Sequence, residues 1–258
     1  MEYQTRGVPP FGASRLLYTA ARESMGGIEL ALRRISELAQ GETGTVRVTT
    51  GATTVRHFMS EAVVEFRFRH PRVSLEFHTD SSSSGCFAAL AEEDLDLAWI
   101  TISKPVRGIE QRPVMDLPWV LAMRTGEIYA DRAWVSVEEL SGLRLIRLPG
   151  GSSSGSTLDA ALTKSGVSLR PDAGIADWDT ALLLAELGVG HAIVPALPGH
   201  PLYGDGLVRL VPLRGLSPLK VGWAVRKWDA LSPFARSFAD AVTRNCRARA
   251  TRIDPAVI

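Results

Sequence analysis

Two hydrophobic periodicities divide the chain into a long helical segment and a following region of alternating strands and helices. From Gly12 to Gln40, apolar residues recur at alternating spacings of four and three, at Ala21, Met25, Ile28, Leu32, Ile35 and Ala39. This spacing is that of a coiled-coil seam. Gly26 and Gly27 each cost a helix about 1 kcal/mol relative to Ala, so the helix needs a partner. We expect that partner to be a second copy of the chain; the alternative is that the stripe packs on the chain's own body.

After the turn at Gly41 to Gly44 the pattern changes to short apolar strands separated by helices. Strands are predicted at Val46–Thr50, Val73–Thr79, Leu95–Ile100, Trp119–Arg124, Leu143–Leu148, His191–Val194, Val208–Leu213 and Leu219–Val225. Helices are predicted over Val55–Phe66, around Phe87–Ala91, from Thr157, from Thr180 and over Pro233–Val242, where Ser232 is the N-cap. The alternation predicts an α/β fold built from successive βαβ units.

Composition excludes several functional classes. No apolar run in the 258 residues approaches the ~20 residues that a membrane span needs. Lys and Arg number 29 against 28 for Asp and Glu, which lacks the basic excess typical of nucleic-acid binding. Cys86 and Cys246 are too few for a disulfide framework or a Cys-rich zinc site, and Glu2 and Arg6 open a segment without the pattern of a secretory signal. We therefore expect a cytoplasmic protein that does not enter membranes.

The loop from Gly150 to Thr157 supplies the strongest enzyme hypothesis. Within it, Gly151-Ser-Ser153-Ser-Gly155 matches the spacing of a nucleophile elbow. Asp177 or Asp179, then His191 or His200, follow in the chain order of an α/β hydrolase. Pro149 and two glycines separate the preceding strand from Ser153, so the context of the motif is only partly met. Ser156 stands where a phosphate loop needs Lys, and the five histidines lack metal-ligand spacing, so neither a nucleotide nor a metal is predicted.

Hydroxyl and glycine residues cluster after successive predicted strands. The clusters are Thr49–Thr54, Ser81–Ser84, Thr101 with Ser103, and Gly150–Ser154. Open α/β sheets bind ligands at the carboxyl ends of their strands. Hydroxyls beside helix N-termini suit a small carboxylate, and Trp99 and Trp178 are placed to flank an apolar or aromatic body.

An ordered set of segments resembles the effector-binding region of LysR-type transcriptional regulators from about Thr43 to Arg244. The segments are Gly44-Thr-Val-Arg-Val-Thr49, Phe66 to Glu76, Leu90 with Leu95-Asp-Leu-Ala98, and Leu187 to Pro195. Upstream, Arg6-Gly7-Val8, Phe11-Gly12 and Arg15-Leu16-Leu17 are similar to the end of that family's winged helix-turn-helix domain running into its linker helix.

The resemblance implies a periplasmic-binding-protein-like fold. Two α/β subdomains would be joined by two crossover strands, near Leu117–Met123 and Leu219–Val225, and preceded by a long linker helix. The implied division is a helix-turn-helix remnant at 1–11, a linker and dimerisation helix at 12–42, subdomain I at 43–120 and 222–258, and subdomain II at 121–221. Most of the DNA-reading domain would be missing.

The resemblance also implies a function and a site. We expect a regulator without enzymatic activity or cofactor, which binds a small organic acid in the cleft between its subdomains. Its assembly would be a homodimer or homotetramer, reaching DNA only through the missing domain or a full-length partner. The implied effector contacts are Thr50, Gly51, Thr53, Thr54, Ser81, Ser82, Ser83, Thr101, Pro149, Gly150, Gly151, Ser152, Asp177, Trp178, Pro195 and Ala196.

Overall fold

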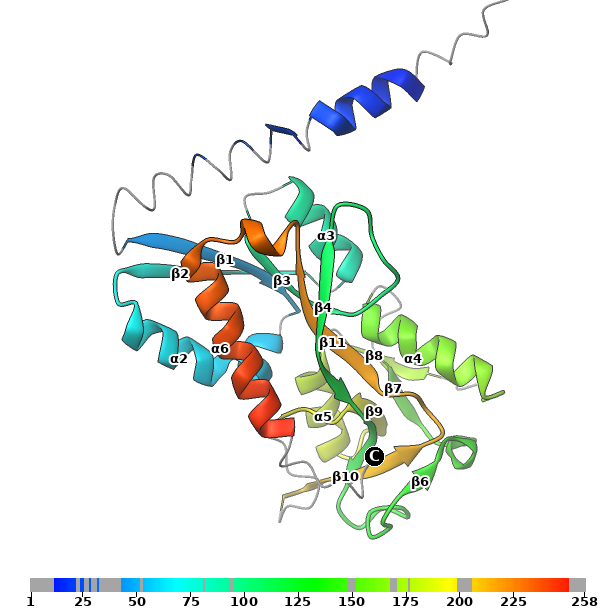
Figure 1. Cartoon of the computed structure of the whole chain (residues 1–258). Coiled ribbons are helices and arrows are strands. Elements are labelled where there is room, and N and C mark those ends of the chain that lie inside the picture. The colour runs from blue at the N-terminus through cyan, green and yellow to red at the C-terminus, as the bar shows by residue number, and fades with distance from the viewer. Residues whose placement is uncertain are drawn as a thin grey trace, which may run out of the picture.

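The chain folds into two α/β subdomains, each built around one sheet, as the computed structural model in Figure 1 shows. The structure describes residues 12–21, 24–25, 28, 32, 43–51, 53–80, 82–92, 95–147, 152–167, 171–175, 177–198 and 206–250. The expected helix-turn-helix remnant at 1–11 and most of the expected linker at 12–42 lie outside these residues.

The first sheet has five strands in the order β2-β1-β3-β11-β4. β1 runs parallel to β2 and β3, whereas β11 runs antiparallel to β3 and β4. The bounds of these strands are β1 Gly44–Thr50, β2 Val73–Thr79, β3 Leu97–Thr101, β4 Glu110–Leu117 and β11 Leu219–Val225. The sheet is therefore mixed, with its parallel part contributed by the first three strands of the chain.

The second sheet has six strands in the order β6-β10-β5-β9-β7-β8. β5 pairs antiparallel with both β10 and β9, and β7 runs parallel to β9 and β8. The bounds are β5 Trp119–Arg124, β6 Val135–Ser136, β7 Leu145–Arg147, β8 Pro171–Gly174, β9 His191–Pro195 and β10 Val208–Arg214.

The chain passes between the sheets twice. It crosses at Pro118, between β4 and β5, and returns over residues 215–218, between β10 and β11. The indole Nε1 of Trp119 donates to the carbonyl oxygen of Ser217 at 3.0 Å, which ties one crossing to the other. The division expected at residues 120/121 and 221/222 falls inside β5 and β11. Each of these strands belongs to a single sheet along its whole length, so the chain changes sheets before each strand begins.

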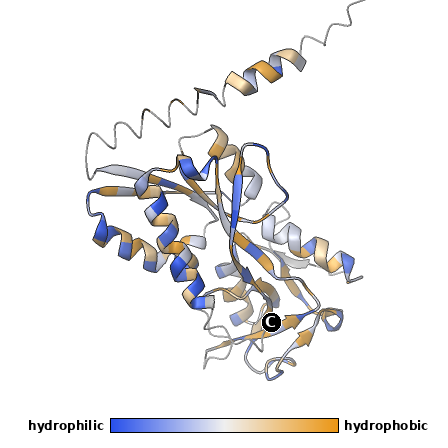
Figure 2. Cartoon of the chain, viewed as in Figure 1, coloured by the Kyte–Doolittle hydropathy of each residue, from blue (hydrophilic) through white to orange (hydrophobic). Residues whose placement is uncertain are grey.

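Helices cover both faces of the first sheet. α2 (Ser60–Arg69) and α6 (Pro233–Ala250) pack on one face, and α3 (Ser83–Glu92) contacts β3 from the other. The alternation along β3 explains this arrangement, since Trp99 joins the main core with Phe66 and Phe238 while Ile100 joins a smaller cluster under α3. Figure 2 shows polar and apolar residues alternating along α6, as expected for a helix with one buried side.

The second subdomain also contains α4 (Ser153–Lys164) and α5 (Trp178–Glu186), and α5 packs against β5, β7 and β9. The short helical turns η1 (Val55–Met59), η2 (Val137–Leu140) and η3 (Trp228–Ala230) complete the elements. η1 is a π-helical turn that leads directly into α2.

The N-terminal helix at residues 12–21 lies apart from both sheets (Figure 1). Its leucines Leu16 and Leu17, and the seam residues Met25, Ile28 and Leu32, are 61 to 73% exposed. The alternative that these apolar side chains pack on the chain's own body is therefore wrong for the described residues. Self-association through the seam stays a prediction.

Candidate functional site

A cavity of about 250 Å³ lies where strands of the first sheet end opposite the first turns of α4 and α5. The first subdomain contributes the larger part of its wall. The lining residues are Gly51, Thr53, Thr54, Phe58, Thr79, Asp80, Ser82, Ser83, Cys86, Trp99, Ile100, Thr101 and Val221 from the first subdomain, and Ser152, Ser153, Ser154, Asp177 and Trp178 from the second. Its size is below the range of drug-sized pockets and fits a small metabolite.

The turn after β1 forms one part of the wall. The backbone N–H of Thr54 donates to the carbonyl oxygen of Gly51 at 3.1 Å, which closes the turn. A side chain at Gly51 would approach the Thr54 hydroxyl to 3.3 Å, so glycine keeps this turn compact. η1 follows directly and places Phe58 in the cavity wall. π-helical turns of this kind recur at functional sites.

The segment between β2 and α3 forms a second part of the wall. The Asp80 Oδ1 atom accepts hydrogen bonds from the backbone N–H of Ser82 at 2.8 Å and from its hydroxyl at 3.1 Å. The Ser82 hydroxyl oxygen in turn accepts from Gly85 N–H at 3.0 Å, and the Ser83 hydroxyl donates to the carbonyl oxygen of Thr101 at 3.2 Å. A side chain at Gly85 would collide with the Asp80 carboxylate. The first turn of α3 is thus held against the carboxyl end of β3.

The second subdomain contributes two capped helix starts. Ser152 is the N-cap of α4, and its hydroxyl accepts from Gly155 N–H at 3.1 Å. Asp177 is the N-cap of α5 and accepts from the backbone N–H and the hydroxyl of Thr180 at 2.9 and 3.0 Å. The indole Nε1 of Trp178 is buried and has no hydrogen-bond partner among the described residues. Trp178 lines the cavity through other atoms of its side chain or backbone, and this buried donor lies behind the wall.

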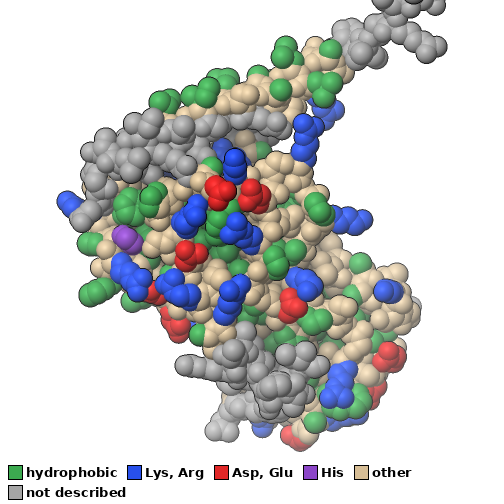
Figure 3. Space-filling view, in the orientation of Figure 1, with side chains coloured by type: hydrophobic (Ala, Val, Ile, Leu, Met, Phe, Trp, Pro, Cys, Tyr) green, Lys and Arg blue, Asp and Glu red, His purple; other side chains and the backbone are tan. Residues whose placement is uncertain are grey.

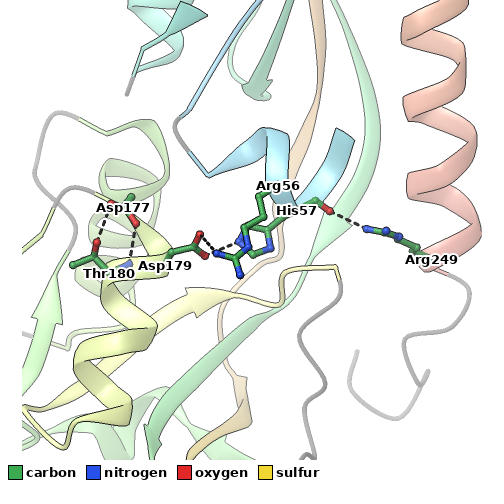
Figure 4. Close-up of polar contacts among 6 residues, drawn as sticks. All are labelled: Arg56, His57, Asp177, Asp179, Thr180 and Arg249. Carbon is green, nitrogen blue, oxygen red and sulfur yellow. Dashed lines mark hydrogen bonds and ion pairs between the residues drawn. The ribbon is translucent and has the colours of Figure 1, made fainter. Parts of the chain in front are cut away.

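Direct contacts beside and within the cavity wall join the two subdomains. In the wall, Ser83 N–H donates to the Ser153 hydroxyl oxygen at 2.7 Å. Beside it, His57 Nε2 lies 2.6 Å from Asp179 Oδ1, with the His57 side chain only 3% exposed. Figure 4 shows that Arg56 reaches the same carboxylate and that Arg249 of α6 donates to the carbonyl oxygen of His57. The two contacts to Asp179 hold the start of α5 against η1, and the Arg249 contact ties η1 to α6.

The structure brings most of the predicted site residues together. Nine of them line the cavity: Gly51, Thr53, Thr54, Ser82, Ser83, Thr101, Ser152, Asp177 and Trp178. Ser81, Pro149, Gly150 and Gly151 lie outside the described residues.

Three predicted residues are not part of the lining. Thr50 is 1% exposed at the end of β1, and its hydroxyl has no partner among the described residues. Pro195 pairs with Trp119 of β5, and Ala196 N–H donates to the carbonyl oxygen of Pro118 at 2.7 Å. Pro195 therefore belongs to the second sheet, and Ala196 contacts the crossing between the sheets.

Ser153 and Ser154 belong to the cluster expected at the ligand-binding edge, although they were not named as effector contacts. Sequence reasoning missed Phe58, Thr79, Asp80, Cys86, Ile100 and Val221 as lining residues. Thr79 and Asp80 carried a usable signal, because they stand at a strand end. Phe58, Ile100 and Val221 have the pattern of core residues and reach the cavity only through the tertiary fold.

Both cysteines are buried and free. Burial raises the pKa of the Cys86 thiol to about 11 and that of the Cys246 thiol to about 12. The thiolate is the reactive form of cysteine, so neither side chain is suited to nucleophilic chemistry at neutral pH.

The geometry around Ser153 does not fit a nucleophile elbow. Ser153 is the first residue of α4 after the N-cap, and its hydroxyl accepts a backbone N–H of the other subdomain. The described lining contains no histidine. His191 begins β9 with both ring nitrogens buried and without a partner among the described residues, and His200 lies outside them. The described residues contain no group of metal-ligating side chains, and no described helix is long and apolar enough to span a membrane.

Comparisons with known proteins agree on one family. A family model described as the LysR substrate binding domain matches residues 39–247. The uncharacterized HTH-type transcriptional regulator YfeR of Shigella flexneri is 23% identical over 215 residues, which are 83% of this chain and 70% of YfeR.

Two solved structures share the fold. The effector binding domain of QuiR in complex with shikimate is 16% identical with a TM-score of 0.68, and the match covers 80% of this chain and 98% of that one. The CcmR regulatory domain of Synechocystis PCC6803 in complex with 2-PG is 14% identical with a TM-score of 0.69, covering 79% and 97%.

Proposed function

The chain belongs to the LysR family of transcriptional regulators, whose substrate-binding domain its residues 39–247 match, and we propose that its cavity binds a small organic acid as effector. The expected family and the periplasmic-binding-protein-like fold of two α/β subdomains are confirmed. The alternative of a serine hydrolase is not supported, because the Ser153 hydroxyl is engaged by Ser83 and the family is one of regulators.

One observation carries the proposal of an acid. The first turns of α3, α4 and α5 meet at a single cavity, with hydroxyls of Thr53, Ser82 and Ser154 in its wall. Helix N-termini present backbone N–H groups and a partial positive charge, which favour carboxylates. Shikimate, bound by the structurally similar QuiR domain, is itself a carboxylate.

The proposal is tested by native mass spectrometry of the intact chain after exposure to a cell extract, looking for a bound small acid. Replacing Thr53 by Val removes one hydroxyl from the wall and should weaken binding of that acid about tenfold. Thr163→Val is the matched control, since the Thr163 hydroxyl is exposed and bonds its own helix at Asp159. Equal affinity of the Thr53 and Thr163 variants would contradict the proposed site.

We also propose that the chain assembles as a homodimer or homotetramer through the N-terminal seam and the outer face of α2. On α2, Val64 and Phe68 are 71% and 89% exposed. They lie four residues apart on one side of the helix, as a docking face requires. We assign the linker to 12–42 and the effector subdomains to the two sheets.

DNA contact is not proposed for the effector subdomains. Figure 3 shows Lys and Arg side chains interspersed with Asp and Glu over the face that it presents. A surface that displaces counterions from DNA needs a continuous basic face instead. In this proposal DNA is reached through a helix-turn-helix domain of the chain or of a partner, and the protein acts in the cytoplasm.

A further inference from the structure

The charged side chains of the cavity wall are all negative. Among the described lining residues, Asp80 and Asp177 are carboxylates, and there is no Lys, Arg or His. Next to the lining residues along the sequence, the positions outside the described ones are Ala52, Ser81, 148–151 (Leu-Pro-Gly-Gly) and Ala176, and none of them is basic. A ligand that carries only negative charge would therefore meet two carboxylates and no basic side chain in this wall.

The helix termini offset these carboxylates only in part. The N-termini of α3, α4 and α5 each contribute roughly half a positive charge, together about one and a half. The two carboxylates outweigh this sum, and they stand at α3 and α5, whereas α4 is capped by the neutral Ser152. A bound monoanion would make the net charge of the cavity more negative, while a zwitterion would leave that net charge unchanged. A ligand with one positive and one negative group is therefore favoured over a ligand with a negative group alone.

The remaining wall also suits an ammonium group. The rings of Phe58, Trp99 and Trp178 line the cavity, and aromatic faces attract cations. Asp80 accepts its two hydrogen bonds at Oδ1, and its Oδ2 accepts none from the described residues. At the other pole, the backbone N–H groups in the first turn of α4, whose N-cap is Ser152, are the donors available to a ligand carboxylate.

We propose that the effector is an amphoteric acid, with its carboxylate at the first turn of α4 and an ammonium group facing Asp80 and Asp177. This inference rests on the proposed function and narrows its ligand class from organic acids to amino acids and related amino carboxylates.

The test uses pairs of compounds that differ only in the amino group. Thermal unfolding of the full chain is followed with ~10 mM of each member of L-alanine and propionate, L-leucine and 4-methylpentanoate, and L-phenylalanine and 3-phenylpropanoate. At least one amino acid should raise the Tm more than its desamino partner. By titration calorimetry it should bind roughly tenfold tighter or more, as expected for hydrogen bonds to charged groups.

Asp80→Asn and Asp177→Asn remove the negative charge while keeping an oxygen that accepts from the backbone N–H of Ser82 or Thr180, respectively. Each should reduce the preference for the amino acid, and the second variant keeps the test valid if the first fails to fold. Asp240→Asn is the matched control, because Asp240 is exposed on α6 and outside the cavity wall. It should preserve the preference.

The outcomes distinguish the amphoteric ligand from the organic-acid proposal on which it rests. If the desamino acids stabilise the chain as much as the amino acids or more, the amphoteric ligand is wrong and the organic-acid site stands. If no compound of the three pairs changes the Tm, the inference is contradicted, and the organic-acid proposal is decided by the native mass spectrometry described above. A preference for the amino acid that survives both Asn variants would overturn the assigned roles of Asp80 and Asp177.

Discussion

Replacing Asp179 by Ala should weaken the junction between the two subdomains more than any other change at its rim. Asp179 belongs to the first turn of α5, two residues after the cavity residue Asp177. Its Oδ1 lies 2.6 Å from Nε2 of His57, whose side chain is 3% exposed. Truncation leaves a buried imidazole nitrogen without its acceptor.

The magnitude follows from the burial of the two partners. A hydrogen bond to a charged group contributes about 1.5 to 3 kcal/mol. Loss of the acidic residue from the first turn of α5 adds about 0.3 to 1 kcal/mol through the helix dipole. The contact with Arg56 adds little, because at 3.5 Å and with the Arg56 side chain 75% exposed it is a surface pair worth about 0 to 1 kcal/mol. We expect Asp179→Ala to lower the free energy of unfolding by about 2 to 4 kcal/mol.

Urea denaturation at constant pH measures this loss. A double-mutant cycle with His57→Ala isolates the pair, and its coupling energy should be about 1 to 2 kcal/mol. Arg56→Ala is the control and should change the free energy of unfolding by less than about 0.5 kcal/mol. The reasoning is refuted if Arg56→Ala costs as much as Asp179→Ala, or if the cycle shows no coupling between His57 and Asp179.

Three further changes have defined outcomes. Gly222→Ala should destabilise the chain by about 3 kcal/mol in urea denaturation, because the new methyl group would collide with the backbone of β4, whereas Gly206→Ala should change stability by less than about 0.5 kcal/mol. Cys86 and Cys246 should resist a thiol reagent at pH 8 until the chain unfolds, since their raised pKa values keep both thiols protonated; rapid labelling of the folded chain would contradict this. Phe68→Glu should lower the mass of the assembly in light scattering if α2 is an interface, and an unchanged mass would exclude that face.

Strands with a regular apolar pattern were predictable from sequence, whereas three of the four edge strands were not. β5 and β11, which are interior, and the edge strand β2 have the predicted bounds, because apolar positions flanked by turn residues identify them. β4, β6 and β8 were missed, and each lies at the edge of its sheet. β4 is the clearest example: it is largely exposed and contains Pro113, so it lacks the apolar signal of a buried strand.

Helix starts were predicted late for a related reason. α4 begins at Ser153 and α5 at Trp178, whereas the apolar pattern placed their starts at Thr157 and Thr180. The caps Ser152 and Asp177 begin each helix before its apolar face starts. Because these first turns line the cavity, the error concerned the residues nearest to the ligand.

The cavity could be located from the clusters at strand ends, but its charge could not. Ser82, Thr53 and Thr101 were expected together, since parallel strands bring their carboxyl ends to one edge. That Asp80 and Asp177 share a cavity without a basic residue in its described wall depends on how the two sheets meet. No local pattern reports that arrangement.

The hydrogen bond between Trp119 and Ser217 has a mechanical consequence. Two short connections that are tied together favour a hinge motion of one subdomain relative to the other over a sliding motion. A hinge at this place changes the opening angle of the cavity mouth. A ligand that touches both walls sets this angle, and surfaces far from the cavity, such as the outer faces of α2 and α5, turn with it as rigid bodies.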